Sequence, residues 1–194
     1  IPEAGPKHER YLPAIFALYK KRHLRVETVV AVDSNEIRGI NSQIDLAEVG
    51  KMVRQNKNEE LMETGVTFED PATTYIDNDV KVGPGTIIHA NVTLEGRTII
   101  GARCEINSGV RIINSTVEDD VTIYNFCVIT DSRLASGTRI GPFAHLRPGT
   151  VMEEGAKVGN FVELKQTNLG AGSKANHLSY IGNATLGREV NIGA

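Results

Sequence analysis

Two basic side chains, Arg147 and Lys165, have the spacing of a stacked pair. They lie 18 residues apart, and each directly follows a leucine of a six-residue repeat. If three repeats make one coil, residues one coil apart become vertical neighbours, separated by about 5 Å, the distance between paired strands. Like charges stacked in this way repel each other unless an anion lies between them. The spacing therefore predicts an anion site, and phosphate is an anion that Arg and Lys hold through charge-assisted hydrogen bonds.

A second column on the same corner contains His145, Glu163 and Tyr180, at steps of 18 and 17 residues. Together with Arg147 and Lys165, it gives one edge cations, a carboxylate, a phenol and an imidazole. One interpretation is a pocket for a phosphorylated and hydroxylated small molecule. The other is a solvated charged edge in which Glu163 neutralises its neighbours, as surface charge clusters usually do. The spacing alone leaves both interpretations open.

A candidate proton acceptor for this edge is His177, three residues before Tyr180. A neutral imidazole is the side chain best suited to accept a proton near pH 7. An amine that attacks a thioester must lose a proton, so His177 is a candidate general base. A single histidine is more often structural, and we interpret His89, which has no column of cations beside it, in that way.

The repeat that would position these side chains fills the chain after about residue 80. An apolar residue recurs at steps of six, with four steps of five, and eighteen of the twenty positions are Ile, Leu or Val. These positions are Val82, Ile88, Leu94, Ile100, Ile106, Ile112, Val117, Ile123, Ile129, Leu134, Ile140, Leu146, Met152, Val158, Leu164, Leu169, Ala175, Ile181, Leu186 and Ile192. A short repeat with one obligatory apolar residue is typical of a β-solenoid, in which each unit buries that residue by stacking on copies of itself. The predicted fold class is therefore a β-solenoid.

Small residues accompany the inward position. The position two residues earlier is small or β-branched, and both cysteines, Cys104 and Cys127, occupy it, so we interpret them as packed thiols in a reducing compartment. The position directly after the inward residue is often glycine, where we expect a turn with φ > 0. These glycines are Gly83, Gly101, Gly141, Gly159, Gly182 and Gly193.

Residues 1–65 follow other patterns. Residues 12–21 have the apolar spacing of a helix, and residues 26–32 form the β-branched run of a buried strand. Residues 42–63 have an apolar helical side. Helix, strand and helix indicate the end of an α/β domain, which lacks a Gly-rich phosphate loop and so cannot bind a nucleotide alone. We expect a domain boundary between residues 1–65 and 66–194. The expected apolar side of the second helix is Ile44, Leu46, Val49, Met52, Val53 and Leu61.

The start of that second helix has two interpretations. Ser42 or Asn41 is an ordinary helix N-cap on spacing alone. The side-chain amide oxygen of Asn41 would instead complete a Mg²⁺ site, which needs hard oxygen ligands. No partner carboxylate can be assigned from the sequence.

Composition excludes several classes of function. The net charge of −3, from 21 basic and 24 acidic residues, gives no electrostatic case for a nucleic-acid partner. No signal peptide and no apolar run near 18 residues is present, so we expect a cytoplasmic protein without a membrane partner. The chain begins at Ile1-Pro2 and stops within a repeat, without the polar cap that a terminal coil needs. We therefore expect a fragment of a longer protein.

Five collinear motifs carry a family resemblance. They are Gly-Ile-Asn-Ser-Gln-Ile-Asp-Leu (39–46), Gly-Pro-Phe-Ala-His-Leu-Arg-Pro-Gly (141–149), Val-Gly-Asn-Phe-Val-Glu-Leu-Lys (158–165), Lys-Ala-Asn-His-Leu-Ser-Tyr (174–180) and Val-Asn-Ile-Gly-Ala (190–194). They closely resemble the bacterial bifunctional N-acetylglucosamine-1-phosphate uridyltransferase/glucosamine-1-phosphate acetyltransferase family, GlmU. The resemblance covers essentially the whole chain.

This resemblance implies a left-handed parallel β-helix over residues 66–194, preceded by the C-terminal remnant of a uridyltransferase (pyrophosphorylase) domain. It also implies a homotrimer with acetyltransferase sites between subunits. His177 would be the general base that deprotonates the amine of glucosamine 1-phosphate for attack on acetyl-CoA. Ala194 would lie where the acetyl-CoA site begins. Asn41 would match a Mg²⁺-binding Asn of the uridyltransferase half, which joins UTP to N-acetylglucosamine 1-phosphate and releases pyrophosphate.

The resemblance further implies a set of substrate-binding residues. Arg147 and Lys165 would hold the phosphate, Tyr180 and Asn191 would contact the sugar, and Glu163 would lie beside them. The pathway would be UDP-N-acetylglucosamine biosynthesis for cell-wall precursors. The family usually has Arg where this chain has His145. We expect these 194 residues alone to have no uridyltransferase activity and little or no acetyltransferase activity.

Two other functions remain to be weighed. One is a non-catalytic, oligomerising β-helix of a sugar-phosphate nucleotidyltransferase, with inert edge residues. Replacing His177 in the full-length protein separates it from the enzyme. The other is a metal-dependent β-helix hydratase with His ligands, which is disfavoured because no His lies one coil from another.

Overall fold

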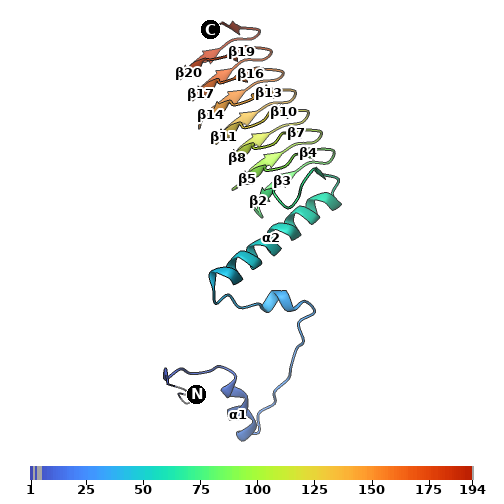
Figure 1. Ribbon diagram of the computed structural model, residues 1–194, viewed down its shortest axis with the longest axis vertical. Helices are drawn as coiled ribbons and strands as arrows, with labels where there is room; N and C mark the ends of the chain where they lie inside the picture. Colours follow the sequence, from blue (N-terminus) through green and yellow to red (C-terminus); the bar gives the residue numbers. More distant parts are fainter. Residues whose placement is uncertain (2, 4–5, 194) are drawn as a thin grey trace. The chain divides into compact units, whose positions relative to one another are not determined.

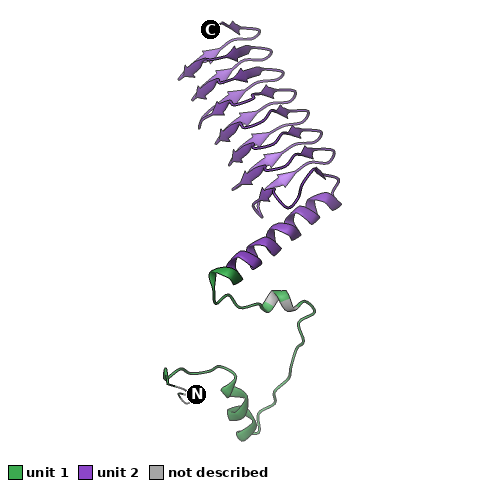
Figure 2. Cartoon of the chain, in the orientation of Figure 1, with its two compact units in different colours: residues 1–45 green, residues 46–194 purple. Residues whose placement is uncertain are grey.

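The structure, a computed structural model, describes residues 1, 3 and 6–193. It divides into two compact units, residues 1–45 and residues 46–194 (Figure 2). The boundary falls within the longest helix, α2 (Gln43–Glu63). Whether the functional domain boundary lies at residue 65 stays a prediction.

The first unit contains the helix α1 (Ala14–Lys21) and the short 3-10 helix η1 (Ser34–Ile37). α1 lies within the predicted helix at 12–21. The predicted buried strand at 26–32 is wrong, because no strand forms there and Val29, Val30 and Val32 are almost fully exposed. A strand needs a hydrogen-bonded neighbour, and the described residues of this unit contain no strand with which 26–32 could pair.

The second unit is a parallel β-solenoid of about seven coils, as predicted, with three sheets along its length (Figure 1). The first sheet contains β1 (Thr67–Phe68), β4 (Ile87–Ile88), β7 (Glu105–Ile106), β10 (Thr122–Ile123), β13 (Arg139–Ile140), β16 (Lys157–Asn160), β19 (Lys174–His177) and β22 (Asn191–Ile192). The second contains β2 (Tyr75–Ile76), β5 (Thr93–Glu95), β8 (Arg111–Ile113), β11 (Val128–Thr130), β14 (His145–Leu146), β17 (Glu163–Lys165) and β20 (Tyr180–Gly182). The third contains β3 (Lys81–Val82), β6 (Ile99–Ile100), β9 (Thr116–Val117), β12 (Arg133–Leu134), β15 (Val151–Met152), β18 (Asn168–Leu169) and β21 (Thr185–Leu186).

The core is the column of inward residues that the repeat predicted. All of them from Ile88 to Ala175 are buried, and those at the two ends of the stack are partly buried against the same core. Each buried Ile, Leu or Val stabilises the fold by roughly 1.5–3 kcal/mol relative to an exposed one. The parallel register places residues 17 or 18 apart opposite each other, as Ile123, Ile140 and Val158 show.

The glycines after the inward residue serve a different purpose from the predicted one. Of the six, only Gly141 has a positive φ. At Gly83 an added Cβ would lie 2.6 Å from the backbone carbon of Gly101, and at Gly159 it would collide with the carbonyl oxygen of Asn176. Three of the six positions, Gly83, Gly101 and Gly159, therefore exclude a side chain because the next coil approaches closely.

The junction between α2 and the solenoid is a Schellman motif. Gly65, with φ 93°, follows the helix, and its N–H donates to the carbonyl of Met62 at 3.0 Å. The N–H of Val66 donates to the carbonyl of Leu61 at 3.1 Å. These two bonds define the motif, and the buried apolar side chains of Val66 and Leu61 are the pair that accompanies it.

α2 buries less of its apolar side than predicted. Leu61 is buried, but Ile44, Leu46 and Val53 are exposed. Polar groups fix the end of the helix instead: the buried Asn58 donates through Nδ2 to the carbonyls of Pro71 (2.9 Å) and Thr74 (3.2 Å).

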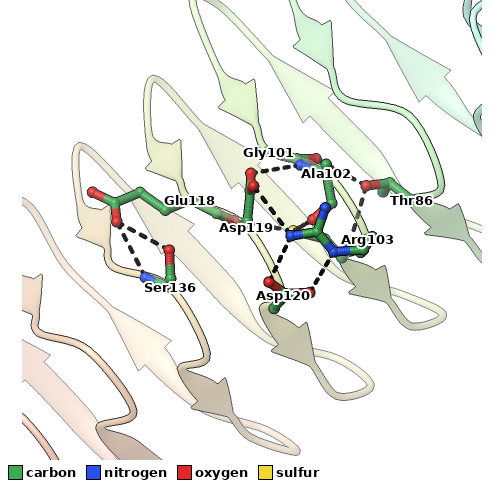
Figure 3. A network of polar contacts seen from close by, with 9 residues as sticks. Thr86, Gly101, Ala102, Arg103, Glu118, Asp119, Asp120 and Ser136 are labelled. Carbon is green, nitrogen blue, oxygen red and sulfur yellow. Dashed lines mark hydrogen bonds and ion pairs between the residues drawn. The ribbon is translucent and has the colours of Figure 1, made fainter.

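Ion pairs and hydrogen bonds join neighbouring coils on the outside (Figure 3). The Arg103 guanidinium donates to both carboxylate oxygens of Asp120 at 2.8 Å and lowers the pKa of that carboxyl below its usual value. Glu118 accepts from the backbone N–H of Ser136 at 3.2 Å. Within the described residues, no helix is both long and apolar enough to cross a membrane.

Candidate functional site

The second sheet and the residue directly after β14 bring together five of the residues singled out from the sequence. His145 pairs with Glu163, and Glu163 pairs with Tyr180. Arg147 follows β14 directly and donates its N–H to the carbonyl of Leu164 at 2.8 Å, which places it beside Lys165 on the next coil. The two columns expected from spacing are therefore present on one sheet.

The two cations of this edge have different environments. Arg147 Nη1 lies 2.9 Å from Glu163 Oε1, in an ion pair whose side chains are 41% and 38% exposed. Lys165 forms no side-chain hydrogen bond or ion pair with any described residue. An exposed ion pair contributes only about 0–1 kcal/mol. An incoming phosphate would therefore meet one available ammonium and one guanidinium that already has a partner.

His177 lies at the end of β19 on the first sheet, and Tyr180 opens β20 on the second. Leu178 and Ser179 form the corner between them, and the Ser179 hydroxyl donates to the His177 carbonyl at 2.9 Å. The imidazole is exposed. This corner therefore lies at the end of the second sheet that carries Tyr180 and its register partner Glu163, and Lys165 follows Glu163 by two residues.

Asn191 lies on the first sheet, away from the two columns of the second. It pairs in register with Lys174, and its Oδ1 accepts from Asn176 Nδ2 at 3.2 Å. It is one coil beyond the strand of His177. Ala194 lies outside the described residues.

A stacked aromatic ladder on the same corner was not expected from the sequence. The rings of Phe126, Phe143 and Phe161 stack with centroids 5.3 Å apart at each step. Leu178 follows on the next coil, where its N–H donates to the carbonyl of Asn160. The signal was available, because the four residues recur at steps of 17 or 18.

A hollow of about 340 Å³ adjoins this corner on the first sheet. Its lining includes Asn160, the register partner of His177, together with Phe143 and Phe161 of the ladder. The glycines Gly141 and Gly159 leave room for it. The exposed His177 is thus one coil from Asn160 of this recess.

At the start of α2, the helix-cap interpretation of Ser42 is confirmed. The Asp45 N–H donates to Ser42 Oγ at 3.1 Å, and the Asp45 carboxylate accepts from the Ser42 hydroxyl (2.9 Å) and the Asn41 N–H (3.1 Å). These hydrogen bonds, the Ser42 hydroxyl first, lower the pKa of Asp45. The nearest carboxylate is thus engaged in the cap. Among the described residues no three His, Cys, Asp or Glu side chains form a metal-binding group, so the residues present do not by themselves fit the octahedral oxygen shell of Mg²⁺.

His89 has the structural role expected of it. Its Nδ1 lies 2.9 Å from Glu69 and its Nε2 lies 3.3 Å from Glu105, on the coils before and after. The hydrogen bond from the Ala90 N–H, followed by that from His89, lowers the pKa of Glu69. Cys104 and Cys127 are both free and buried.

Comparisons with known proteins identify relatives for the whole chain. A model of the GMPPB C-terminal domain matches residues 71–166. The bifunctional protein GlmU of Pelobacter propionicus is 43% identical over 187 residues, which is 96% of this chain and 41% of that protein. GlmU of Thermodesulfovibrio yellowstonii is 44% identical over 194 residues, covering 100% of this chain and 43% of that protein. The chain spans about two fifths of the length of these curated relatives.

Among solved structures, the acetyltransferase domain of PglB from Neisseria gonorrhoeae, in complex with acetyl coenzyme A, is similar with a TM-score of 0.47 and 20% identity. The match covers 73% of this chain and 65% of that one.

Proposed function

We propose, for a chain whose sequence is GlmU-like along its whole length, that the solenoid transfers an acetyl group from acetyl-CoA to the amine of glucosamine 1-phosphate. The proposal is supported by the sequence likeness to GlmU and by one geometric observation. That observation is the position of the exposed His177 directly before the corner that leads into β20, whose Tyr180 and Gly182 pair in register with Glu163 and Lys165.

In the proposed reaction, Lys165 and Arg147 bind the phosphate of the sugar. Arg147 keeps Glu163 as a second partner, which fixes the direction of the guanidinium. Tyr180 and Asn191 contact the sugar. Orientation of this kind supplies much of the rate gain of a two-substrate reaction.

His177 accepts a proton from the amine while the nitrogen attacks the thioester carbonyl carbon. The carbon–sulfur bond then breaks, and coenzyme A leaves as its thiol. The imidazolium supplies the proton of that thiol and so returns to its neutral form. A positioned base of this kind typically contributes about 10²–10⁴-fold to the rate.

Further parts of the proposal concern the whole protein. They are a homotrimer in the cytoplasm and, in a preceding domain, uridylyl transfer from UTP to N-acetylglucosamine 1-phosphate. Ala194 would begin the acetyl-CoA site, outside the described residues. Asn41 would be one Mg²⁺ ligand of the uridyltransferase half, and because the other ligands are not among the described residues we derive no step through the metal.

The decisive experiment replaces His177 by Ala in the protein that contains this chain. We expect kcat for acetyl transfer to fall by about 10²–10⁴-fold with little change in KM for glucosamine 1-phosphate. His23→Ala is the matched control, because His23 is exposed and lies outside the solenoid. If His177→Ala and His23→Ala both have unchanged turnover, His177 is not the general base.

A second candidate is a non-catalytic solenoid that only holds subunits of a nucleotidyltransferase together. One observation favours it: Arg147 already has a carboxylate partner, as in an ordinary charged surface. Lys165→Gln separates the two candidates. A phosphate site predicts a KM for glucosamine 1-phosphate at least about ten-fold higher, whereas an inert edge predicts no effect on any activity.

A further inference from the structure

Three cations form a column on the outer face of the first sheet. Arg139 pairs in register with Lys157, and Lys157 pairs with Lys174. The two coil steps span roughly 10 Å. All three side chains are exposed, and none forms a hydrogen bond or ion pair with any described residue. The column is therefore a line of unneutralised positive charge.

Four other arginines of the solenoid pair with carboxylates of a neighbouring coil. Four ion pairs follow this pattern: Arg103–Asp120, Arg111–Glu95, Arg133–Glu118 and Arg147–Glu163. Like charges directly opposite each other on neighbouring strands are destabilising. The column repeats one sign over three coils, so it carries a cost that folding alone does not explain.

Glycines leave the column unobstructed. Gly137, Gly155 and Gly172 lie two residues before the three cations, and Gly141 and Gly159 lie two residues after the first two. The face of the sheet beside the column therefore carries few other side chains. Because few side chains surround them, all three cations are accessible to a ligand.

Hollows border the column on both sides. The recess of about 340 Å³ includes Lys157 in its lining, and a second of about 650 Å³ includes Lys174. Both include Asn176. The second also contains one carboxylate, Glu189, and Glu154 lines a separate hollow toward the third sheet. Among the described residues neither carboxylate forms an ion pair with the column, so the line keeps its positive charge.

We propose that this column binds a linear polyphosphate anion, a chain of phosphates joined through shared oxygens. A line of cations is matched by a line of negative charges, whereas a single phosphate would reach only part of it. An acidic peptide fits less well, because linked phosphates follow each other more closely than the carboxylates of a peptide. A phosphate chain therefore places more negative charge along the roughly 10 Å of the column.

The column borders the proposed acetyltransferase site, because Lys174 shares β19 with His177 and pairs in register with Asn191, but it contains none of the residues that have a role in acetyl transfer. Arg147 and Lys165 belong to the second sheet, while the column belongs to the first. Binding to the column does not require acetyl transfer, so the proposal stands or falls independently of the catalytic role of His177.

The test is isothermal titration calorimetry of the 194-residue chain with inorganic tripolyphosphate, at low salt and without divalent metal ions. We expect one saturable site whose affinity falls as KCl is raised, because salt screens exposed charges. Lys157→Gln removes the central cation and should weaken binding at least about ten-fold. Lys81→Gln is the matched control, since Lys81 is an exposed cation on the third sheet opposite Ile99, and it should leave binding unchanged.

Titrations with ATP identify the source of the phosphate chain. ATP binding more tightly than tripolyphosphate, with the same loss in Lys157→Gln, assigns the site to a nucleotide. Equal affinities assign it to the free polyphosphate. The proposal is overturned by absence of saturable binding at millimolar tripolyphosphate, by equal losses in Lys157→Gln and Lys81→Gln, or by a poly-glutamate peptide that binds as tightly.

Discussion

Gly159 and Gly187 are two glycines of the solenoid with opposite surroundings. A Cβ added at Gly159 would collide with the backbone carbonyl of Asn176 on the next coil, whereas one added at Gly187 would meet no atom within 4 Å. Neither has a positive φ. The pair therefore separates the effect of close coil packing from that of glycine flexibility.

We expect Gly159→Ala to destabilise the chain by roughly 1–3 kcal/mol, the usual cost of overpacking. Gly187→Ala should change the free energy of unfolding by less than about 0.5 kcal/mol or stabilise the chain slightly. Urea unfolding followed by circular dichroism measures both. Equal stability of the two variants would mean that the coils can move apart at little cost.

The two buried thiols, those of Cys104 and Cys127, allow a second prediction about single residues. Burial raises the pKa of Cys127 to about 11 and raises that of Cys104 as well. The thiolate is the reactive form, so at pH 8 we expect both thiols of the folded chain to react very slowly with Ellman's reagent. In urea both should react at once. Rapid modification of the native chain would show that the coil corners holding Cys104 and Cys127 open readily.

The sequence was sufficient to predict which site residues are neighbours where the backbone alone determines their positions. The stacking of Arg147 on Lys165 and of His145 on Glu163 follows from a fixed coil length, so spacing was sufficient to predict it. The ion pair between Arg147 and Glu163 depends on rotamers, which spacing does not determine.

At the scale of elements, the solenoid strands were predictable because each repeats a pattern that only stacking satisfies. The run at 26–32 has the composition of a strand, but composition does not supply a pairing partner. For α2 the helical period was correct, yet Leu46 and Val53 are exposed because only the last turns contact the first coil. Periodicity shows which face is apolar and not what covers it.

The contact between α2 and the first coil can be tested through Asn58. Its side chain is buried and donates to the carbonyls of Pro71 and Thr74. Asn58→Ala leaves two carbonyls without that donor, so we expect a loss of about 1–3 kcal/mol in the free energy of unfolding. Gln55→Ala is the control, because Gln55 is exposed and its amide bonds only Glu59 on the helix surface. Similar losses in both variants would contradict a buried role for Asn58.

At the scale of the whole solenoid unit, stability comes from one apolar column inside and many polar bonds between coils outside. The Arg111 guanidinium donates to both oxygens of Glu95 at 2.5 and 3.0 Å and lowers the pKa of that carboxyl. The pKa values of Glu118 and Asp120 are lowered in the same way, by Arg133 and Arg103 respectively. These carboxylates all shift in one direction, so their effects on stability add along the stack.

The direction of these shifts fixes the pH dependence. A carboxyl whose pKa is lower in the folded state stabilises the fold above its unfolded pKa, and the stabilisation is lost as the pH falls through the folded pKa. We therefore expect the free energy of unfolding to be level near pH 7 and to decline below about pH 5, where unfolded carboxylates begin to take up protons. Urea unfolding between pH 7 and pH 3 measures this decline.

A variant assigns the decline to the bonds between coils. Glu95→Gln should be less stable than the native chain at pH 7, and the difference should close as the pH falls, because the native carboxylate is then protonated as well. Glu154→Gln is the control: Glu154 is exposed and forms no side-chain bond with any described residue, so its small effect should not vary with pH. A constant difference for Glu95→Gln across the whole range would mean that the Arg111–Glu95 pair contributes nothing to acid sensitivity, and that the loss of stability in acid arises elsewhere in the molecule.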